Sequence, residues 1–254
     1  MNYFRGKPIN KDMVRLNFSK KKSRQPLLSL IYRFTKFPFA GKKKKFRLFL
    51  RLHWIFWRLS IEQAEKIYTL KENPARMASL QFLLGKIENG FSVIDMGCKY
   101  GDTSALIAQK AAVVIGIDHD DVAIETAKLR HKEKNLSFLF SDAVEYLGKQ
   151  TEKFDVIILS HFIEQLEVPE DFLRKAKEHY RFFYLEIPDF DDSSFNHYRK
   201  ALGETLIYTD NYDRWVFDRD SLSEMITSCG LRIMESECRH GVLKFWCMNP
   251  GIDD

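Results

Sequence analysis

The chain has 254 residues, 45% of them hydrophobic, which is enough for one sizeable core and an appendage. Its formal net charge of +5 conceals an asymmetry, because residues 1–60 hold 17 lysines and arginines against one acid, Asp12. The remainder has 23 basic and 34 acidic residues, so the sequence indicates a basic arm joined to an acidic domain.

The cysteines indicate neither a metal site nor a disulfide framework. Their positions, which show no CxxC or Cys/His metal spacing, are Cys98, Cys229, Cys238 and Cys247. The first residues are polar and charged, unlike a secretory leader. We therefore expect free thiols, no bound metal and a cytoplasmic protein.

Residues 27–59 of the arm have the composition of a membrane-surface segment. At 100° per residue, Arg47, Arg51 and Arg58 share a narrow sector of a helix over residues 46–59, opposite a broad apolar face. Such a helix can lie in an anionic membrane surface, where each nearby lysine contributes ~1 kcal/mol. Its apolar run is well short of the ~20 residues that span a bilayer.

Two alternatives for this segment remain open. The apolar face can pack on the acidic domain and leave the arginines in solvent. The basic arm can instead bind RNA or DNA phosphates, with aromatic side chains stacking on bases. The wide apolar face favours lipid over nucleic acid.

Two capping signals follow the arm. Ser60 to Gln63 has the form of a capping box, which predicts a new helix from Ser60 to about Lys71. Asn73 followed by Pro74 predicts a further helix, with the proline in its first position. We therefore divide the chain into an extension, residues 1–60, and a domain, residues 61–254.

Residues 91–118 have the order strand, glycine turn, helix, strand. An apolar run ends on Asp95, Gly97 and Gly101 form the turn, and a second apolar run ends on Asp118. This order predicts the βαβ unit of a nucleotide-binding sheet. Glycines allow a sharp turn and a close approach to a ligand. Asp118 can accept both hydroxyls of a ribose, and Asp95 can hold loop amides or a ligand ammonium.

The sequence DMGCKYG, with glycines four positions apart, resembles motif I of class I S-adenosylmethionine-dependent methyltransferases, Asp-x-Gly-x-Gly-x-Gly. Lys99 occupies the middle glycine position, where its side chain can narrow the methionine pocket or meet the ligand carboxylate. The resemblance implies that S-adenosylmethionine binds at Asp95, Gly97, Cys98, Lys99, Gly101, Asp118 and His119. The alternative is an ordinary α/β turn that binds nothing.

A third strand is predicted at residues 136–140, and Ser141, Asp142 and Ala143 follow it. In the methyltransferase pattern, Asp142 would bond the adenine amino group and Ala143 would supply a neighbouring amide. Asp142 can also serve as the N-cap of a helix over residues 143–149, and the two roles are compatible.

The fourth strand, residues 154–160, is an apolar run typical of a buried parallel strand. The sequence after it resembles the Ser-x-x-Ile-Glu-His-Leu of small-molecule and glycan methyltransferases, which assigns Ser160 to the cofactor and Glu164 to catalysis. Gln165 stands in the usual histidine position. His161 can act as a general base, line the cofactor pocket or be a satisfied histidine at a strand end.

The fifth strand, residues 182–187, is followed by Pro188 and Asp189, and the Glu-Ile-Pro-Asp sequence resembles Glu-x-Pro-Asn of polysaccharide-associated methyltransferases. We expect Asp189 to point into the mouth of the cleft. Residues 190–217 form a long connection, either a substrate loop or a small helical insertion with its own aromatic packing. Its candidate walls for a sugar or aromatic substrate are His197, Tyr198, Tyr208, Tyr212 and Trp215.

The last elements are a helix with a capping box from Ser221 to Glu224, ending at Gly230, and two strands at residues 231–237 and 242–248. The strands resemble the antiparallel pair that closes the sheet of class I methyltransferases. The predicted fold is therefore α/β and Rossmann-like, with seven mostly parallel strands, an antiparallel terminal hairpin and a basic N-terminal helical extension.

The resemblance implies methyl transfer to a hydroxyl of a small-molecule, glycan or lipid-linked acceptor, and the basic amphipathic arm favours the inner membrane surface as its place. One alternative is an RNA methyltransferase that uses the arm on phosphates, although an Asn/Asp-Pro-Pro-Tyr motif is missing after the fourth strand. Another alternative is a membrane-associated scaffold with a decayed cofactor site. It stays open because Lys99 and Gln165 depart from the methyltransferase motifs. The sequence does not indicate the oligomeric state.

Overall fold

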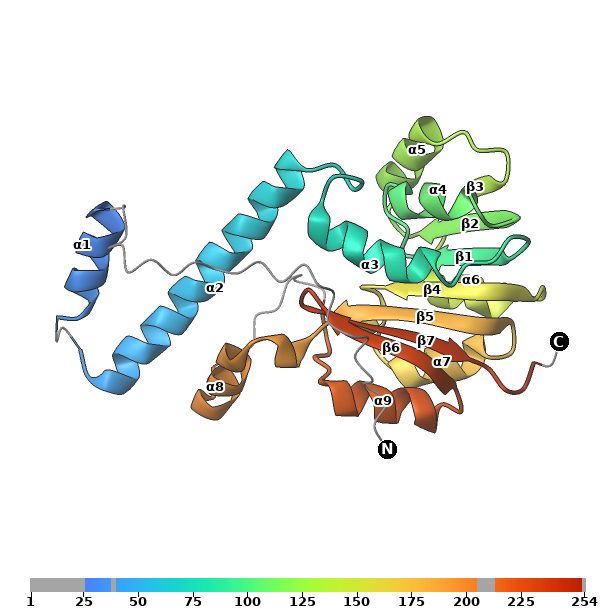
Figure 1. Ribbon diagram of the computed structural model, residues 1–254. Helices are drawn as coiled ribbons and strands as arrows, with labels where there is room; N and C mark the ends of the chain where they lie inside the picture. The colour runs from blue at the N-terminus through green and yellow to red at the C-terminus, as the bar shows by residue number, and fades with distance from the viewer. Residues whose placement is uncertain (1–25, 38–39, 205–212, 253–254) are drawn as a thin grey trace, which may run out of the picture.

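A seven-stranded sheet is the centre of the computed structural model, which describes residues 26–37, 40–204 and 213–252 (Figure 1). The strand order is β3-β2-β1-β4-β5-β7-β6. The strands are β1 (Ser92–Met96), β2 (Val113–Asp118), β3 (Leu136–Phe140), β4 (Phe154–Ser160), β5 (Tyr180–Pro188), β6 (Arg232–Arg239) and β7 (Val242–Met248). Strands β1 to β5 are parallel, whereas β7 runs antiparallel to β5 and β6. The predicted fold class is confirmed.

Helices cover both faces of the sheet. Val156 and Ile158 of β4 face a core formed with α3 and α4, whereas Ile157 and Leu159 face a core formed with α6, α7 and α9. All four side chains are fully buried. This two-sided burial explains why the central strands are continuous apolar runs. The helices around the sheet are α3 (Pro74–Leu84), α4 (Asp102–Ala108), α5 (Asp121–Arg130), α6 (Ala143–Lys149), α7 (Pro169–Ala176) and α9 (Arg219–Ser228).

Among the predicted helix starts after the arm, Asn73 is confirmed and the two capping boxes are corrected. Asn73 accepts hydrogen bonds from two backbone amides of α3, as expected. Ser60 starts no helix, because its hydroxyl bonds the carbonyl of Phe56 inside a continuous helix. The N-cap of α9 is Asp218, with Ser221 as the third helical residue of the box. Both incorrect capping-box predictions made a serine the first residue of a helix that in fact begins earlier in the chain.

The extension contains α1 (Pro26–Thr35) and the long helix α2 (Lys42–Ile67). The predicted division at residue 60 falls inside α2, and no backbone break marks it. Figure 1 shows α2 on the side of the sheet to which the arrowheads of β4 and β5 point. Among the described residues, no helix has the length and apolarity of a membrane span.

The connection after β5 contains the short helix η2 (Phe190–Asp192) and α8 (Ser194–Leu202), which packs against α2. The buried Arg199 of α8 donates a hydrogen bond to the carbonyl of Leu50 at 3.1 Å. Glu204 forms ion pairs with Arg47 and Arg51, at 3.1 and 3.0 Å. The arm and the insertion therefore form one packed unit beside the carboxyl ends of the strands.

Candidate functional site

The glycine turn after β1 is held by the backbone of β2. The amides of Gly97 and Cys98 donate to the carbonyl of Ile117, at 2.8 and 3.0 Å. Gly97 and Gly101 both have φ of 78°, in the left-handed region that glycine adopts at little cost. A Cβ at Gly97 would also come within 3.2 Å of the Phe162 ring. The predicted turn is therefore present and narrow.

The ring of Phe138 in β3 leaves no room for a side chain at two glycines. A Cβ at Gly101 would lie 2.5 Å from Phe138 Cε1, and a Cβ at Gly116 would lie 2.7 Å from Phe138 Cδ1. Gly116 in β2 was missed from the sequence, although a glycine within a β-branched run signals a close approach. Cys98 completes this packing and is buried, which raises the pKa of its thiol far above the ordinary value.

Lys99 has φ of 48°, so the backbone at this position has the left-handed conformation that the usual glycine would provide. Its amide donates to Asp118 Oδ2 at 2.8 Å, and its side chain is exposed. The backbone therefore tolerates this substitution. The two predicted roles of the Lys99 side chain stay predictions.

Asp118 is buried at the end of β2, between two loop amides. Its Oδ2 accepts from Lys99 and its Oδ1 accepts from the amide of Asp120 at 3.0 Å. A carboxylate oxygen has a second lone pair, so this geometry still suits the two hydroxyls of a ribose. The neighbouring His119 side chain is 83% exposed, with its Nδ1 3.6 Å from Asp118 Oδ1. The assignment of both residues to the cofactor stays a prediction.

Asp95 faces helix α4 and accepts a hydrogen bond from the Ser104 hydroxyl at 2.5 Å. Burial raises the pKa of Asp95 to about 6, against the opposing effect of that hydrogen bond and with a smaller contribution from Asp118. The described contacts of Asp95 are thus structural, and its contact with a ligand ammonium remains untested.

Asp142 is the N-cap of α6, as one of its two predicted roles required. Its Oδ1 accepts from the amides of Val144 and Glu145, both at 2.9 Å. Asp142 is exposed and Ala143 is half-buried at the end of β3. This position is compatible with the predicted adenine contacts, which stay predictions.

His161 lies between two buried carboxylates at the ends of β4 and β5. Its Nδ1 is 3.5 Å from Glu164 Oε1, and its Nε2 is 3.5 Å from Glu186 Oε1. The Ser160 hydroxyl donates to Glu186 Oε1 at 3.3 Å, and the Tyr184 hydroxyl bonds the other carboxylate oxygen. Burial acts to lower the pKa of His161, but the two carboxylates outweigh it and raise that pKa to about 9.

The structure thus brings together His161 and Glu164, the two predicted catalytic residues, and adds Glu186. A histidine that is protonated at neutral pH cannot accept a proton, so this environment opposes its predicted role as general base. Glu186 occurs in the Glu-Ile-Pro-Asp sequence, but nothing in the sequence indicated which partner it meets.

Glu164 lies in η1 (Ile163–Gln165) and is 2% exposed. Burial raises the pKa of its carboxyl, in opposition to the effect of His161. The carbonyl of Glu164 accepts hydrogen bonds from the amides of Arg214 and Trp215, at 2.8 and 3.1 Å. These bonds fix the end of the insertion beside the carboxylate. A small recess here is lined by Glu164, Ile187, Pro188, Phe190, Asp213, Trp215, Val216 and Phe217.

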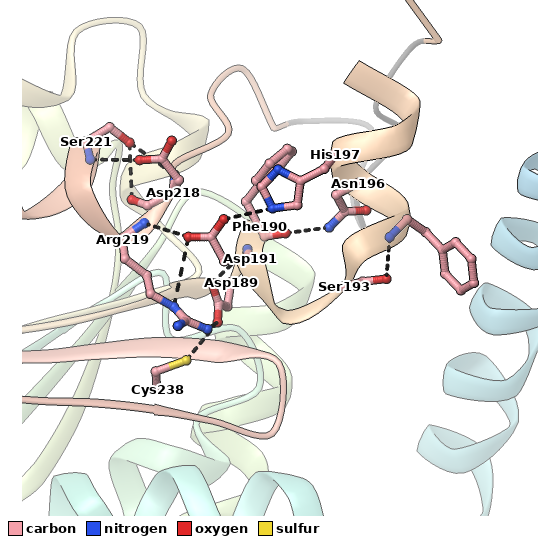
Figure 2. Close-up of polar contacts among 11 residues, drawn as sticks. Asp189, Phe190, Asp191, Ser193, Asn196, His197, Asp218, Arg219, Ser221 and Cys238 are labelled. Carbon is pink, nitrogen blue, oxygen red and sulfur yellow. Dashed lines mark hydrogen bonds and ion pairs between the residues drawn. The ribbon is translucent and has the colours of Figure 1, made fainter. Parts of the chain in front are cut away.

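The prediction that Asp189 points into the cleft mouth is wrong. Its side chain is fully buried and pairs with Arg219 Nη2 at 2.7 Å, while the Cys238 thiol donates to its Oδ2 at 2.7 Å (Figure 2). Asp189 also caps η2 through the amide of Asp191. It therefore joins the insertion to β6 and α9.

The predicted substrate walls have different positions. Trp215 lines the recess, and its indole donates to the carbonyl of Leu166 at 2.9 Å. His197 pairs with Asp191 instead, as Figure 2 shows, and Tyr198 stacks edge-on against Phe46 of α2. The remaining two, Tyr208 and Tyr212, lie outside the described residues.

Comparison with known proteins agrees with the observed fold. A family model described as a methyltransferase domain matches residues 68–236. Ubiquinone biosynthesis O-methyltransferase of Histophilus somni is 32% identical over 114 residues, 41% of this chain and 46% of that protein. The chain spans about half the length of such curated relatives.

Two solved structures share the fold. An S-adenosylmethionine-dependent methyltransferase from Aquifex aeolicus has a TM-score of 0.53 at 15% identity, over 74% of this chain and 97% of that chain. Magnesium protoporphyrin IX methyltransferase from Synechocystis PCC 6803 with bound S-adenosylhomocysteine has a TM-score of 0.52 at 16% identity, over 69% and 84%. At these identities the likeness establishes the fold.

Proposed function

Since the chain belongs to the methyltransferase-domain family, we propose that it is an S-adenosylmethionine-dependent methyltransferase that methylates a hydroxyl on a small or glycan head group of a membrane lipid. The name of the O-methyltransferase relative supports oxygen as the acceptor atom. Bound S-adenosylmethionine supplies an electrophilic methyl group. The protein contributes by aligning the acceptor in a closed site.

The cofactor-binding part of this proposal fits the turn between β1 and α4. The left-handed conformation of residues 97, 99 and 101 brings the backbone close to the ends of β1 and β2. Asp118 can hold a ribose there, and Asp142 with Ala143 lies at the end of the adjacent strand β3. The intact turn geometry argues against a decayed site.

The observation that carries the membrane part is an apolar face on α2 that no described residue covers. Five side chains, spaced so that they follow one side of the helix, are exposed by 37 to 64%. This apolar stripe consists of Leu48, Leu52, Ile55, Phe56 and Leu59. Helix α1 exposes further apolar side chains, which are Leu30, Ile31, Tyr32 and Phe34.

Helix α2 packs on the insertion through the side that carries the buried Leu50, and the apolar stripe lies on another side. Arg47 and Arg51 border this contact and pair with Glu204, and the apolar stripe is exposed among the residues that the structure describes. These ion pairs engage two arginines of the basic arm, which leaves them less available to phosphates and so favours lipid over RNA. The exposed lysines at residues 42–44 lie at the start of the same helix and suit anionic head groups.

Flotation with vesicles tests the membrane part. Full-length protein should float with vesicles of anionic phospholipid and stay behind with zwitterionic ones. The double variant Leu52→Glu, Phe56→Glu should lose flotation, because charges on the apolar stripe cannot enter the lipid. Val122→Glu is the matched control, since Val122 is 68% exposed on α5, away from the stripe.

The acceptor is tested by incubation of the protein with a total lipid extract and S-adenosylmethionine that carries a labelled methyl group. Label should appear in the lipid fraction as an ether. If wild-type protein did not float with anionic vesicles, the membrane part of the proposal would be wrong. If the label were confined to water-soluble products, the lipid acceptor would be wrong.

A further inference from the structure

The Glu164 carboxylate is buried, and no described residue donates a hydrogen bond of good geometry to it. Neither of its oxygens receives one from the residues that the structure describes, and both are sealed from solvent. The nearest ring nitrogen of His161 is 3.5 Å from Oε1, which is long for a hydrogen bond. A buried carboxylate normally gains several donors, because its desolvation is costly. The carboxylate therefore lacks a hydrogen-bond donor, and a bound ligand can supply one.

The recess beside Glu164 defines what kind of ligand fits. Its walls are largely apolar or aromatic, with Ile187, Phe190 and Phe217 among them. Asp213 adds a second acidic group, and it raises the pKa of Glu164. The recess lies at the carboxyl end of β5, the edge at which open α/β sheets bind their ligands. The recess has room for little more than a hydroxyl group, so an apolar acceptor would place its hydroxyl against the carboxylate and keep its body at the mouth.

His161 does not compete for the proton of that hydroxyl. Both of its ring nitrogens face carboxylates, Glu164 on one side and Glu186 on the other. Behind Glu186 lie the Tyr184 hydroxyl and the buried ammonium of Lys244, which also pairs with Glu237. This arrangement keeps the imidazole protonated and its ring fixed.

We propose that Glu164 binds the acceptor hydroxyl and takes its proton, whereas His161, held against Glu186, is a positioning residue. The inference deepens the proposed function and rests on it. The acceptor oxygen forms the new bond to the methyl carbon as the carbon–sulfur bond breaks, and the hydroxyl proton passes to Glu164. The proton passes to water once the methylated product has left and water has entered the recess.

The first test uses phenol and toluene as probes, because they differ mainly in a hydroxyl. Binding to the full-length protein, with S-adenosylhomocysteine present, is followed by NMR of the Trp215 indole and the His161 ring. Phenol should bind at least tenfold more tightly than toluene. The Glu164→Gln variant should lose this preference, and Glu167→Gln, at an exposed position on the same segment, should keep it.

The second test follows the proton. The His161 ring, identified with His161→Gln, should titrate near pH 9 in the wild type and at least one pH unit lower in Glu164→Gln. With the methylated lipid fraction as readout, Glu164→Gln should slow transfer about a hundredfold at unchanged affinity for S-adenosylhomocysteine. His161→Gln should slow it about tenfold.

Equal binding of phenol and toluene would overturn the proposal, as would full transfer by Glu164→Gln beside complete loss in His161→Gln. If only the lipid-acceptor part of the proposed function were wrong, wild-type protein would label no lipid but would still bind phenol more tightly than toluene. The two failures are therefore distinguishable.

Discussion

The two halves of the carboxyl edge of the sheet are built in different ways. Around the glycine turn, backbone amides and short contacts dominate, and Asp118 meets amides from its own βαβ unit. Around β4 and β5, side chains from distant segments meet. Arg199 reaches Leu50 across 149 positions of sequence, and Arg51 reaches Glu204 across 153. The first half is therefore held by contacts between residues close in sequence. The second half forms only when segments far apart in sequence have come together.

The local half is most sharply tested at Gly101. Gly101→Ala should lower the free energy of unfolding by about 4 kcal/mol, because its methyl group would overlap Phe138 in a backbone conformation that alanine disfavours. Gly203→Ala is the control, since φ there is 65° but no atom lies within 4 Å of the added Cβ. It should cost about 1 kcal/mol. Urea unfolding measures both losses of unfolding free energy. Equal losses in the two variants would show that overlap with Phe138 does not constrain Gly101.

Asp95 gives the local half a pH dependence. Its carboxyl ionises near pH 4 in the unfolded chain and near pH 6 in the folded protein, so the folded state holds the extra proton in between. Stability should therefore fall as pH rises through this window, by up to about 3 kcal/mol. Urea unfolding of Asp95→Asn at pH 4 to 7 should show a smaller decline than the wild type. A constant difference between the two proteins would contradict this assignment.

The distant half is tested at Arg199, which is buried and donates to Leu50, His53 and Asn196. Arg199→Met should lower the unfolding free energy by about 2 kcal/mol, because these acceptors lose their donor. It should leave affinity for S-adenosylhomocysteine unchanged. Arg51→Met, at a side chain that is 69% exposed, should cost less than about 1 kcal/mol. A loss of cofactor affinity in Arg199→Met would show that the halves are coupled.

The difference between the halves also explains what the sequence could predict. The bounds of β3, β4 and α6 agree with those expected, because apolar runs and a cap at Asp142 are local signals. The glycine turn was recognisable for the same reason. Asp189 was misplaced because its partner Arg219 lies 30 positions further along the chain.

The arm shows the same limit. Periodicity identified the basic and apolar sides of α2, but which side packs depends on Glu204 and Arg199. Ser60 matched a capping box, yet a helix that is already continuous leaves its hydroxyl only an internal carbonyl. Glu186 could be assigned to a strand, but its encounter with His161 requires β4 and β5 to be adjacent.

Helix α2 is an unbroken rod of 26 residues, about 39 Å long at 1.5 Å per residue. One side is fastened to α8 and the apolar stripe lies on another, so adsorption through the stripe would also fix how the domain sits on the bilayer. An enzyme held in this way searches for its acceptor in two dimensions. Its turnover would then follow the mole fraction of acceptor within the lipid, and dilution of the vesicles at constant composition would leave the rate per bound enzyme unchanged.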